Sequence, residues 1–268
     1  MKQASIVVVT GVSSGIGRAT AELFANQGHR VFGTVRKLAT ATALSGVELI
    51  EMDVTDDRSV RTGIQRILER SGRIDILVNN AGVSLIGSVE ETSIQEATAL
   101  FDTNLLGTVR TIQAVLPQMR RQGSGRIVNL SSVVGFLPAP YMGFYAASKH
   151  AVEGLSETLD HEVRQFGIRV SLVEPAYTRT QLDANSPHAA QRIPAYDTQH
   201  DQLAQSISRS IATSPGPERV AQTILKAAFG SWRLHHTPPG IASFLNKARR
   251  FLPASLLDSL IRKSAGLA

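Results

Sequence analysis

Short runs of apolar, often β-branched residues alternate with longer stretches of helical spacing along most of the chain. Most runs are apolar on both strand faces, which indicates strands buried between two layers of helices. This alternation is typical of βαβ units, so we predict one α/β domain of the Rossmann type, a doubly wound parallel sheet of about seven strands with helices on both faces. The predicted strands are residues 5–10, 30–35, 47–52, 74–78, 126–130, 168–174 and 232–236.

Longer stretches between these runs carry the spacing of amphipathic helices. Thr55 and Thr92 precede the second and third of them and are predicted to cap them. The third stretch is long, and we expect it to break into two helices near residues 102–104. The predicted helices are residues 15–27, 56–71, 92–121, 144–166 and 218–229.

The periodic pattern weakens after Pro175. Residues 178–217 are polar, rich in alanine and interrupted by four prolines, which favours a mobile lid over a core layer. We therefore predict a main domain over residues 1–240 that includes this lid. Residues 241–268 form a basic amphipathic tail. Packing on its own domain or on a second subunit is the simpler interpretation of the tail, and weak contact with an anionic membrane surface is the alternative.

The composition excludes several kinds of site and partner. The chain has no cysteine, so disulfides, cysteine-ligated metals and thiol chemistry are ruled out, and we expect no metal site. The formal charge is +6, but the 28 lysines and arginines are spread out and gather only near the end, so nucleic acid is not an expected partner. No segment reaches the roughly 20 apolar residues of a membrane span, and the apolar start leads into a glycine loop instead of a cleavage site. We expect a cytoplasmic protein.

A glycine-rich segment follows the first predicted strand and opens the first helix. Backbone amides at such a helix N-terminus can face a pyrophosphate, and glycine lets the chain turn and approach the ligand closely. A strand-to-helix turn of this kind is often only a turn, and its spacing differs from the common GxGxxG pattern. The candidate residues for nucleotide binding are Gly11, Ser13, Ser14, Gly15, Ile16 and Gly17.

Tyr145 and Lys149 lie four positions apart in a predicted helix, so their side chains emerge on one face, one turn apart. A tyrosine with a pKa near ~10 is a poor base at neutral pH, but a neighbouring ammonium group favours the phenolate. Tyr145 can then donate a proton to a carbonyl oxygen or accept one from an alcohol. Such pairs also occur on ordinary solvated helix faces, so the context decides. Ser132 lies thirteen residues before Tyr145 and follows a strand, at the edge where open sheets bind ligands.

Five ordered segments resemble the motifs of the short-chain dehydrogenase/reductase family, over roughly residues 4–180. The family pattern TGxxxGxG matches the glycine-rich segment, and NNAG matches residues 79–82. PGxxxT matches residues 175–180, with Ala176 in place of the usual glycine. The chain also resembles the branch that includes hydroxysteroid and retinol dehydrogenases. The remaining motif residues are Asn104, Ser132, Tyr145 and Lys149.

The resemblance implies a role for each matched residue. Tyr145 handles the proton and contacts both the substrate and the cofactor, and Lys149 tunes the tyrosine and holds the nicotinamide ribose. Ser132 orients the substrate oxygen, with Ser131 as the alternative. Asn104 is implied to bend its helix and to hold a water of the proton relay. The other implied cofactor contacts are Asp53 and Val54 at the adenine, Asn80, Ala81 and Gly82 after the fourth strand, and Pro175, Thr178 and Thr180 near the nicotinamide.

The end of the second strand bears on which dinucleotide binds. An acidic residue there would hydrogen-bond a free ribose hydroxyl, but the strand is followed by Arg36 and Lys37. The planar fork of Arg36 matches a 2′-phosphate, so NADP(H) is expected in preference to NAD(H). Two points oppose this assignment. Arg36 and Lys37 are also interpretable as ordinary loop charges, and the family's second basic position, just before Gly15, holds Ser14.

The expected function is that of an oxidoreductase that interconverts an alcohol and a ketone or aldehyde. A hydrophobic substrate, similar to a steroid, a retinoid or an aromatic compound, is favoured because the segments expected to hold it are rich in apolar residues. The alternative is a regulatory protein that senses NADP on the same fold without chemistry. The family resemblance also implies a homodimer or homotetramer. The candidate pocket residues, most of which are equally interpretable as packing residues of the core or the lid, are Phe136, Leu137, Met142, Phe144, Tyr177 and Leu182.

Overall fold

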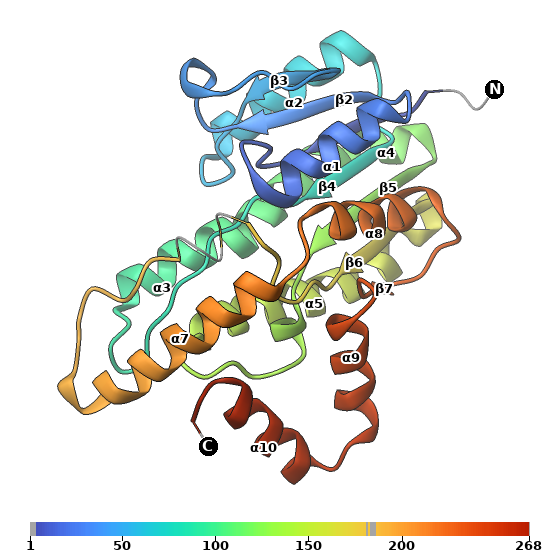
Figure 1. Cartoon of the computed structure of the whole chain (residues 1–268). Coiled ribbons are helices and arrows are strands. Elements are labelled where there is room, and N and C mark those ends of the chain that lie inside the picture. Colours follow the sequence, from blue (N-terminus) through green and yellow to red (C-terminus); the bar gives the residue numbers. More distant parts are fainter. Residues whose placement is uncertain (1–3, 181, 183–185, 268) are drawn as a thin grey trace.

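The computed structural model describes residues 4–180, 182 and 186–267. Within these ranges, seven parallel strands form one sheet in the order β3-β2-β1-β4-β5-β6-β7 (Figure 1). The order reverses between β1 and β4, which is the place where open sheets of this kind bind ligands. The strands are β1 (Ile6–Val9), β2 (Arg30–Val35), β3 (Val47–Glu51), β4 (Ile76–Asn79), β5 (Gly125–Leu130), β6 (Ile168–Val173) and β7 (His235–His236).

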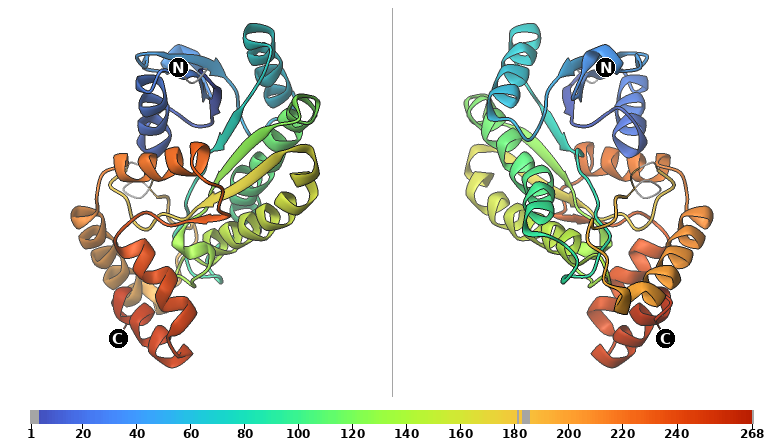
Figure 2. Two further views of the ribbon diagram at one scale, coloured as in Figure 1. Left: turned by 90° about the vertical axis from the view of Figure 1, so that its right-hand side faces the viewer. Right: turned by 90° about the vertical axis from the view of Figure 1, so that its left-hand side faces the viewer.

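Helices cover both faces of the sheet (Figure 2). Successive residues of a strand point to opposite faces, so Val8 packs in one apolar layer while Val7 and Val9 pack in the other. Burial on both faces explains why the strand sequences lack an apolar and polar alternation. The helices are α2 (Asp57–Ser71), α4 (Gly107–Gln122) and α5 (Gly143–Val163) in the layer with Val8, and α1 (Gly15–Asn26) and α8 (Glu218–Phe229) in the layer with Val7 and Val9.

The fold class and the seven strands confirm the prediction, and the last strand is shorter than expected. The predicted strand over residues 232–236 shrinks to β7, of two residues. Trp232 lies outside it, and its indole donates a 2.8 Å hydrogen bond to the carbonyl of Val170 and stacks under the Arg169 guanidinium, 3.4 Å from the ring centroid. The indole is therefore fixed by side-chain contacts rather than by strand pairing.

Both predicted helix caps were wrong by one position. Asp56, not Thr55, caps α2, and its carboxylate accepts a 2.6 Å hydrogen bond from the amide three residues further on. Ser93, not Thr92, caps the next helix through a capping box in which Ser93 and Glu96 each accept from the other's backbone amide. Each correct cap stands directly beside the predicted threonine, so the helix starts were right to within one or two residues.

The long helical stretch after Ser93 divides into two α-helices at the predicted place. The chain passes from α3 (Ile94–Phe101) into α4 through a π-helical turn (Asp102–Leu106), without an intervening loop. A π turn widens the helix locally and is frequent at functional sites. Here it carries Asn104, which is only 2% exposed, into the interior.

The segment predicted to form a lid contains a helix of 17 residues, α7 (Asp197–Thr213), which the sequence reading missed. The tail forms two helices, α9 (Ile241–Phe251) and α10 (Ala254–Ser264), which project from the end of the domain near α7 (Figure 2). The end of the tail packs on α7, where Ala265 joins Leu203 in a small apolar cluster. In the described part of the chain, no helix is both long and apolar enough to cross a membrane.

Candidate active site

The glycine loop after β1 is packed too closely for side chains. Gly11 has a φ of +70°, and a Cβ there would lie 2.9 Å from the Cα of Ala81. At Gly17 a Cβ would lie 2.3 Å from both the Gly11 carbonyl oxygen and the Asn80 side-chain nitrogen. Real Cβ atoms do not come so close to backbone, so only glycine permits this loop. The bare backbone forms a cradle of the kind that a dinucleotide pyrophosphate occupies.

Asn80 and Thr10 hold this loop against the end of β4. The Asn80 amide group donates to the carbonyl oxygens of Thr10 (2.9 Å) and Gly11 (3.0 Å). In return the Thr10 hydroxyl accepts from the backbone amides of Asn80 and Ala81, at 3.0 Å each. The NNAG match therefore has a structural explanation, since the Asn80 side chain braces the loop while the residue itself lines the cavity described below.

The start of α1 leaves room for an external acceptor. Ser14 precedes the helix in an extended conformation and makes no side-chain capping hydrogen bond. The first amides of a helix need partners from outside it. The loop and the amides after Ser14 therefore fit the pyrophosphate of a dinucleotide, and Ser13, Gly15 and Ile16 lie in the same turn.

The adenosine side of the candidate site lies past β2 and β3. Arg36 directly follows β2, is exposed, and has no hydrogen-bond or ion-pair partner for its side chain among the described residues. Asp53 follows β3, and one oxygen of its carboxylate accepts from the amide (2.9 Å) and hydroxyl (2.8 Å) of Thr55. Val54 is buried beside Gly107 at the start of α4. Arg36 is thus free to pair with an anionic group, while Asp53 is partly engaged.

The α5 helix brings Tyr145 and Lys149 together as predicted. The Lys149 nitrogen lies 5.8 Å from the centroid of the Tyr145 ring and donates a 2.9 Å hydrogen bond to the Leu130 carbonyl at the end of β5. Burial lowers the pKa of Lys149, while the charge of Glu153 opposes this, and the result is a pKa of about 8. At pH 7 the lysine is therefore still mostly protonated and supplies the positive charge beside the phenol.

Ser132 and Ser131 have different surroundings. The Ser132 hydroxyl donates to the Pro175 carbonyl and accepts from the Val134 amide, both at 3.3 Å. These distances exceed the usual range for hydroxyl hydrogen bonds, so a substrate oxygen can compete for the group. The Ser131 hydroxyl is buried beside Gly135 and has no hydrogen-bond partner among the described residues. The geometry favours Ser132 over Ser131 as the residue that meets the substrate.

The Asn104 side chain, which lies in the π turn, is held by hydrogen bonds to Val83 and Ser148. Its amide oxygen accepts from the Val83 amide at 2.8 Å, and its nitrogen donates to the Val83 carbonyl at 2.9 Å and to the Ser148 hydroxyl at 3.1 Å. Gly82 lies between Asn104 and Lys149, because a Cβ at Gly82 would be 3.2 Å from the Asn104 oxygen and 3.9 Å from the Lys149 nitrogen. The helix distortion expected at Asn104 is present, and its role in a proton relay stays a prediction.

The loop after β6 lies over the glycine loop. Thr180 contacts Gly15, where an added Cβ would lie 3.3 Å from the Thr180 Cβ. Thr178 is buried, and its hydroxyl donates to the Ala176 carbonyl at 3.0 Å. Ala176 does not need the conformational freedom of the glycine it replaces, since Tyr141 is the one non-glycine residue with positive φ in the described ranges. The departure from the PGxxxT pattern therefore leaves the loop intact.

Glu153 of α5, Glu174 at the end of β6 and His235 of β7 form a cluster of charged side chains. Glu174, at the end of β6, is buried and accepts a 2.7 Å hydrogen bond from the His235 ring. Hydrogen bonds with Glu153 and Glu174 raise the pKa of His235 to about 10. His235 is therefore protonated at neutral pH and offsets the negative charge of Glu153, which raises the pKa of Lys149. Burial raises the pKa of Glu174.

One cavity of about 640 Å³ joins these groups. Ser132, Tyr145 and Lys149 lie in its wall, together with Asn80 and Gly82 from the cofactor end. The sequence-predicted apolar residues are divided, because Leu137, Met142, Tyr177 and Leu182 line the cavity whereas Phe136 and Phe144 do not. The apolar wall that sequence reasoning missed comes from α7, α9 and α10, with Leu203, Ile207, Ile241, Leu245 and Ile261.

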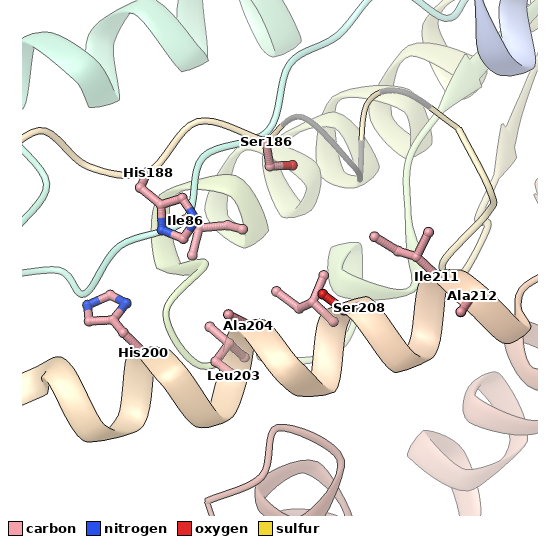
Figure 3. A pocket seen from close by; sticks show the side chains of 10 residues that line it. Ile86, Ser186, His188, His200, Leu203, Ala204, Ser208, Ile211 and Ala212 are labelled. Carbon is pink, nitrogen blue, oxygen red and sulfur yellow. The ribbon is translucent and has the colours of Figure 1, made fainter.

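A second, smaller cavity of about 370 Å³ lies between α7 and the segments that carry Ile86 and His188 (Figure 3). Near it, the His200 ring makes a 2.6 Å hydrogen bond with Glu91, a side chain with no exposed surface. Burial raises the pKa of Glu91, but hydrogen bonds from the Ile193 amide, His200 and Ser88 outweigh it and lower the pKa to about 2. This buried pair ties α7 to the loop after β4 and so fixes one wall of the larger cavity.

Comparisons with known proteins agree with this geometry. The family model described as short chain dehydrogenase matches residues 5–191. The 3-ketodihydrosphingosine reductase of Bacteroides thetaiotaomicron is 40% identical over 217 residues, which cover 81% of this chain and 78% of the relative. The human 17-beta-hydroxysteroid dehydrogenase type 1 is 35% identical over 275 residues, with 93% and 79% covered. The crystal structure of a short-chain dehydrogenase from Streptomyces avermitilis superposes with a TM-score of 0.82 at 34% identity, with both chains fully covered.

Proposed function

The chain belongs to the short-chain dehydrogenase/reductase family of NAD(P)-binding oxidoreductases that act on CH–OH and C=O groups, and on that premise we propose that it interconverts a hydrophobic alcohol and its ketone or aldehyde with NADP(H). The observation that carries this proposal is the shared cavity, in which Ser132, Tyr145 and Lys149 meet the residues at the glycine-loop end. The proton donor Tyr145, the positively charged Lys149 and residues next to the glycine loop all line this cavity, which is large enough for a small molecule.

The proposed mechanism assigns each step to a side chain. The bound cofactor supplies or accepts the hydride, and the protein supplies the proton and the orientation. In reduction, Ser132 donates a hydrogen bond to the carbonyl oxygen and Tyr145 gives that oxygen its hydroxyl proton. The ammonium of Lys149 stabilises the phenolate that remains. Oxidation runs the same proton transfer in reverse, and no metal ion is required.

The cavity wall supports a hydrophobic substrate. Leucine and isoleucine make up half of the lining residues that α7 and the tail supply, and hydroxyl groups of Ser206, Ser210, Thr213 and Ser264 lie among them. Most of the remaining lining residues away from Ser132, Tyr145 and Lys149 are apolar. Two relatives are named for 3-ketodihydrosphingosine and for a 17-beta-hydroxysteroid. We therefore place the substrate among steroid-like, retinoid-like or aromatic carbonyl compounds and alcohols.

The test is a direct assay of turnover. The purified chain is mixed with NADPH and a panel of steroid, retinoid, aromatic and simple aliphatic carbonyl compounds, or with NADP+ and the corresponding alcohols, and nicotinamide absorbance is followed. We expect consumption of NADPH with one of the hydrophobic carbonyl compounds and slow or no consumption with short polar ones. The absence of turnover across the whole panel, in both reaction directions, contradicts the proposal.

The preference for NADP(H) rests on Arg36. Because its guanidinium is exposed and has no partner among the described residues, it is available to a 2′-phosphate. Replacing Arg36 with Asp removes the cation and adds an acceptor for a ribose hydroxyl, so the ratio of kcat/KM for NADPH to that for NADH is expected to fall by about a hundredfold. Arg66→Asp, the same charge change on an exposed face of α2, is the control and should leave the ratio unchanged. An equal ratio in the Arg36 variant and the wild type contradicts the assignment.

The location, oligomeric state and partners that we propose follow from the sequence and from the family. We place the protein in the cytoplasm, as a homodimer or homotetramer built on the helices over residues 103–121 and 144–166. Its small-molecule partner is the hydrophobic alcohol or carbonyl compound, and nucleic acid is not a partner. A weak contact with a membrane surface is assigned to the tail.

A further inference from the structure

The inner faces of α9 and α10 form part of the substrate cavity. Leu245 from α9 and Ile261 from α10 line it, and Ile241 lies in its wall at the start of α9. Hydrogen bonds hold both helices in place, since Arg249 donates to the Phe136 carbonyl at 3.1 Å and the Ser206 hydroxyl of α7 donates to the Ser264 carbonyl at 2.8 Å. The tail therefore forms part of the wall of the cavity.

The outer faces of the same two helices are apolar and exposed. Phe251 is 74% exposed and Phe244 is 56% exposed, and because they are seven residues apart on α9 they lie on the same face. Leu256 and Leu260, four residues apart, share a face of α10. We call the exposed large apolar residues of this segment the tail surface, and they are Ile241, Phe244, Phe251, Leu252, Leu256 and Leu260.

The cavity wall and the tail surface meet at Ile241. Its side chain lines the cavity, yet the residue is 56% exposed, so it marks a rim where the cavity adjoins the outside. Leu182, on another lining segment, is likewise 39% exposed. An apolar molecule resting on the tail surface is therefore next to an apolar opening.

The charge of the tail points to one kind of partner. Residues 241–268 contain five lysines and arginines and a single acidic residue, Asp258, so four of the six net positive charges of the chain fall in this segment. Exposed phenylalanines and leucines flanked by cations are the composition of helices that lie on anionic membranes. A second copy of this chain is less well matched, because a two-fold contact would bring the same cations together.

We infer that the tail surface docks on an anionic membrane and that the substrate enters the cavity from the lipid at the Ile241 rim. The inference rests on the proposed function for the identity of the catalytic cavity. In this arrangement one face of the tail lines the cavity, where Leu245 and Ile261 contact the substrate. The other face binds the membrane, where Phe244 and Phe251 insert among lipid chains. The substrate class narrows to carbonyl compounds and alcohols that partition into a bilayer.

Docking is tested without any assay of turnover. The full-length protein is sedimented with vesicles of phosphatidylcholine containing phosphatidylglycerol, and with vesicles of phosphatidylcholine alone. We expect binding at least about tenfold tighter to the anionic vesicles, weakened by salt, and a loss of about tenfold in the Phe244→Ser/Phe251→Ser variant. The matched control is Ile94→Ser, which removes a side chain that is 77% exposed at the start of α3 and should bind like the wild type.

Two outcomes of the docking experiment overturn the inference. One is equal sedimentation of the wild type and the double variant. The other is a change in oligomeric state, measured by light scattering, in which the double variant is a smaller assembly than the wild type. The second result would assign the tail surface to contact between copies of the chain.

Substrate entry is tested with one hydrophobic ketone held in anionic vesicles and one ketone of the same apolar skeleton that carries a solubilising group and that the wild type also reduces. The double variant is expected to retain the wild-type rate on the soluble ketone and to lose about fivefold or more on the vesicle-borne one, because only the second depends on docking. Equal rates for both forms on the vesicle-borne ketone, or an equal loss on both ketones, overturn entry from the membrane. If the wild type turns over neither ketone, the proposed function fails, and the sedimentation result still decides the docking.

Discussion

Replacing Tyr145 with phenylalanine is expected to lower kcat by about a thousandfold while the dissociation constant for NADPH stays within about twofold of the wild type. The substitution removes one oxygen and leaves the ring that lies 5.8 Å from the Lys149 nitrogen. The cofactor cradle is formed by the glycine loop and by Asn80, whose amide group donates to the carbonyl oxygens of Thr10 and Gly11. Proton transfer is thus lost without loss of the binding site.

The measurement pairs steady-state turnover with cofactor titration by fluorescence. Ser156→Ala serves as a control for general damage to α5, since that hydroxyl is buried and bonded to Asn129 at 2.9 Å, away from the cavity. It should lower the free energy of unfolding by about 1 kcal/mol and leave kcat nearly unchanged. A Tyr145 variant that keeps its ligand response and shows no change in any rate would favour the sensing alternative, in which the fold binds NADP without chemistry.

The Gly17→Ala substitution is expected to have the second large effect, which is on the affinity for the cofactor and not on proton transfer. The new Cβ would lie 2.3 Å from the Gly11 carbonyl oxygen and from the Asn80 amide nitrogen, so the loop must shift. A forced shift of this kind costs about 1–3 kcal/mol. It also moves the amides that face the pyrophosphate, and we expect the dissociation constant for NADPH to rise by about a hundredfold.

Gly154→Ala provides the matched control within the same protein. Gly154 lies in α5, and a Cβ there meets nothing within 4 Å. Alanine should therefore raise the melting temperature slightly, since it favours helix by about 1 kcal/mol over glycine, and cofactor affinity should not change. A Gly17 variant with wild-type cofactor affinity would show that the close packing of the glycine loop is not what forms the binding site.

The strands of the sheet and the pairing of Tyr145 with Lys149 could be predicted from the sequence, because both depend on the spacing of residues close together in the chain. Strands buried on both faces appear as unbroken apolar runs, and the α5 periodicity alone places Tyr145 one turn from Lys149. The caps were missed by one position because a threonine stands beside each true cap, Asp56 and Ser93, and composition does not rank such neighbours.

The apolar wall of the cavity was harder to predict. The prolines around residues 187–194 and 215–217 obscured α7, although Leu203, Ile207 and Ile211 repeat every four residues within it and signal a helix. The sequence does not predict that α9 and α10 line the same cavity as Tyr145. Contacts between segments about a hundred residues apart depend on tertiary packing, which no local pattern encodes.

The cavity draws its reactive groups and its apolar walls from different parts of the chain. Ser132, Tyr145 and Lys149 are fixed by β5 and α5, while α7, α9 and α10 come after the last long strand. Mutations that accumulate in the later segments can therefore reshape what fits while the proton donor and its neighbours stay as they are. Proteins with this arrangement can therefore acquire new substrates through mutations in the C-terminal third of the chain. The proton-transfer chemistry is retained, because its residues lie elsewhere.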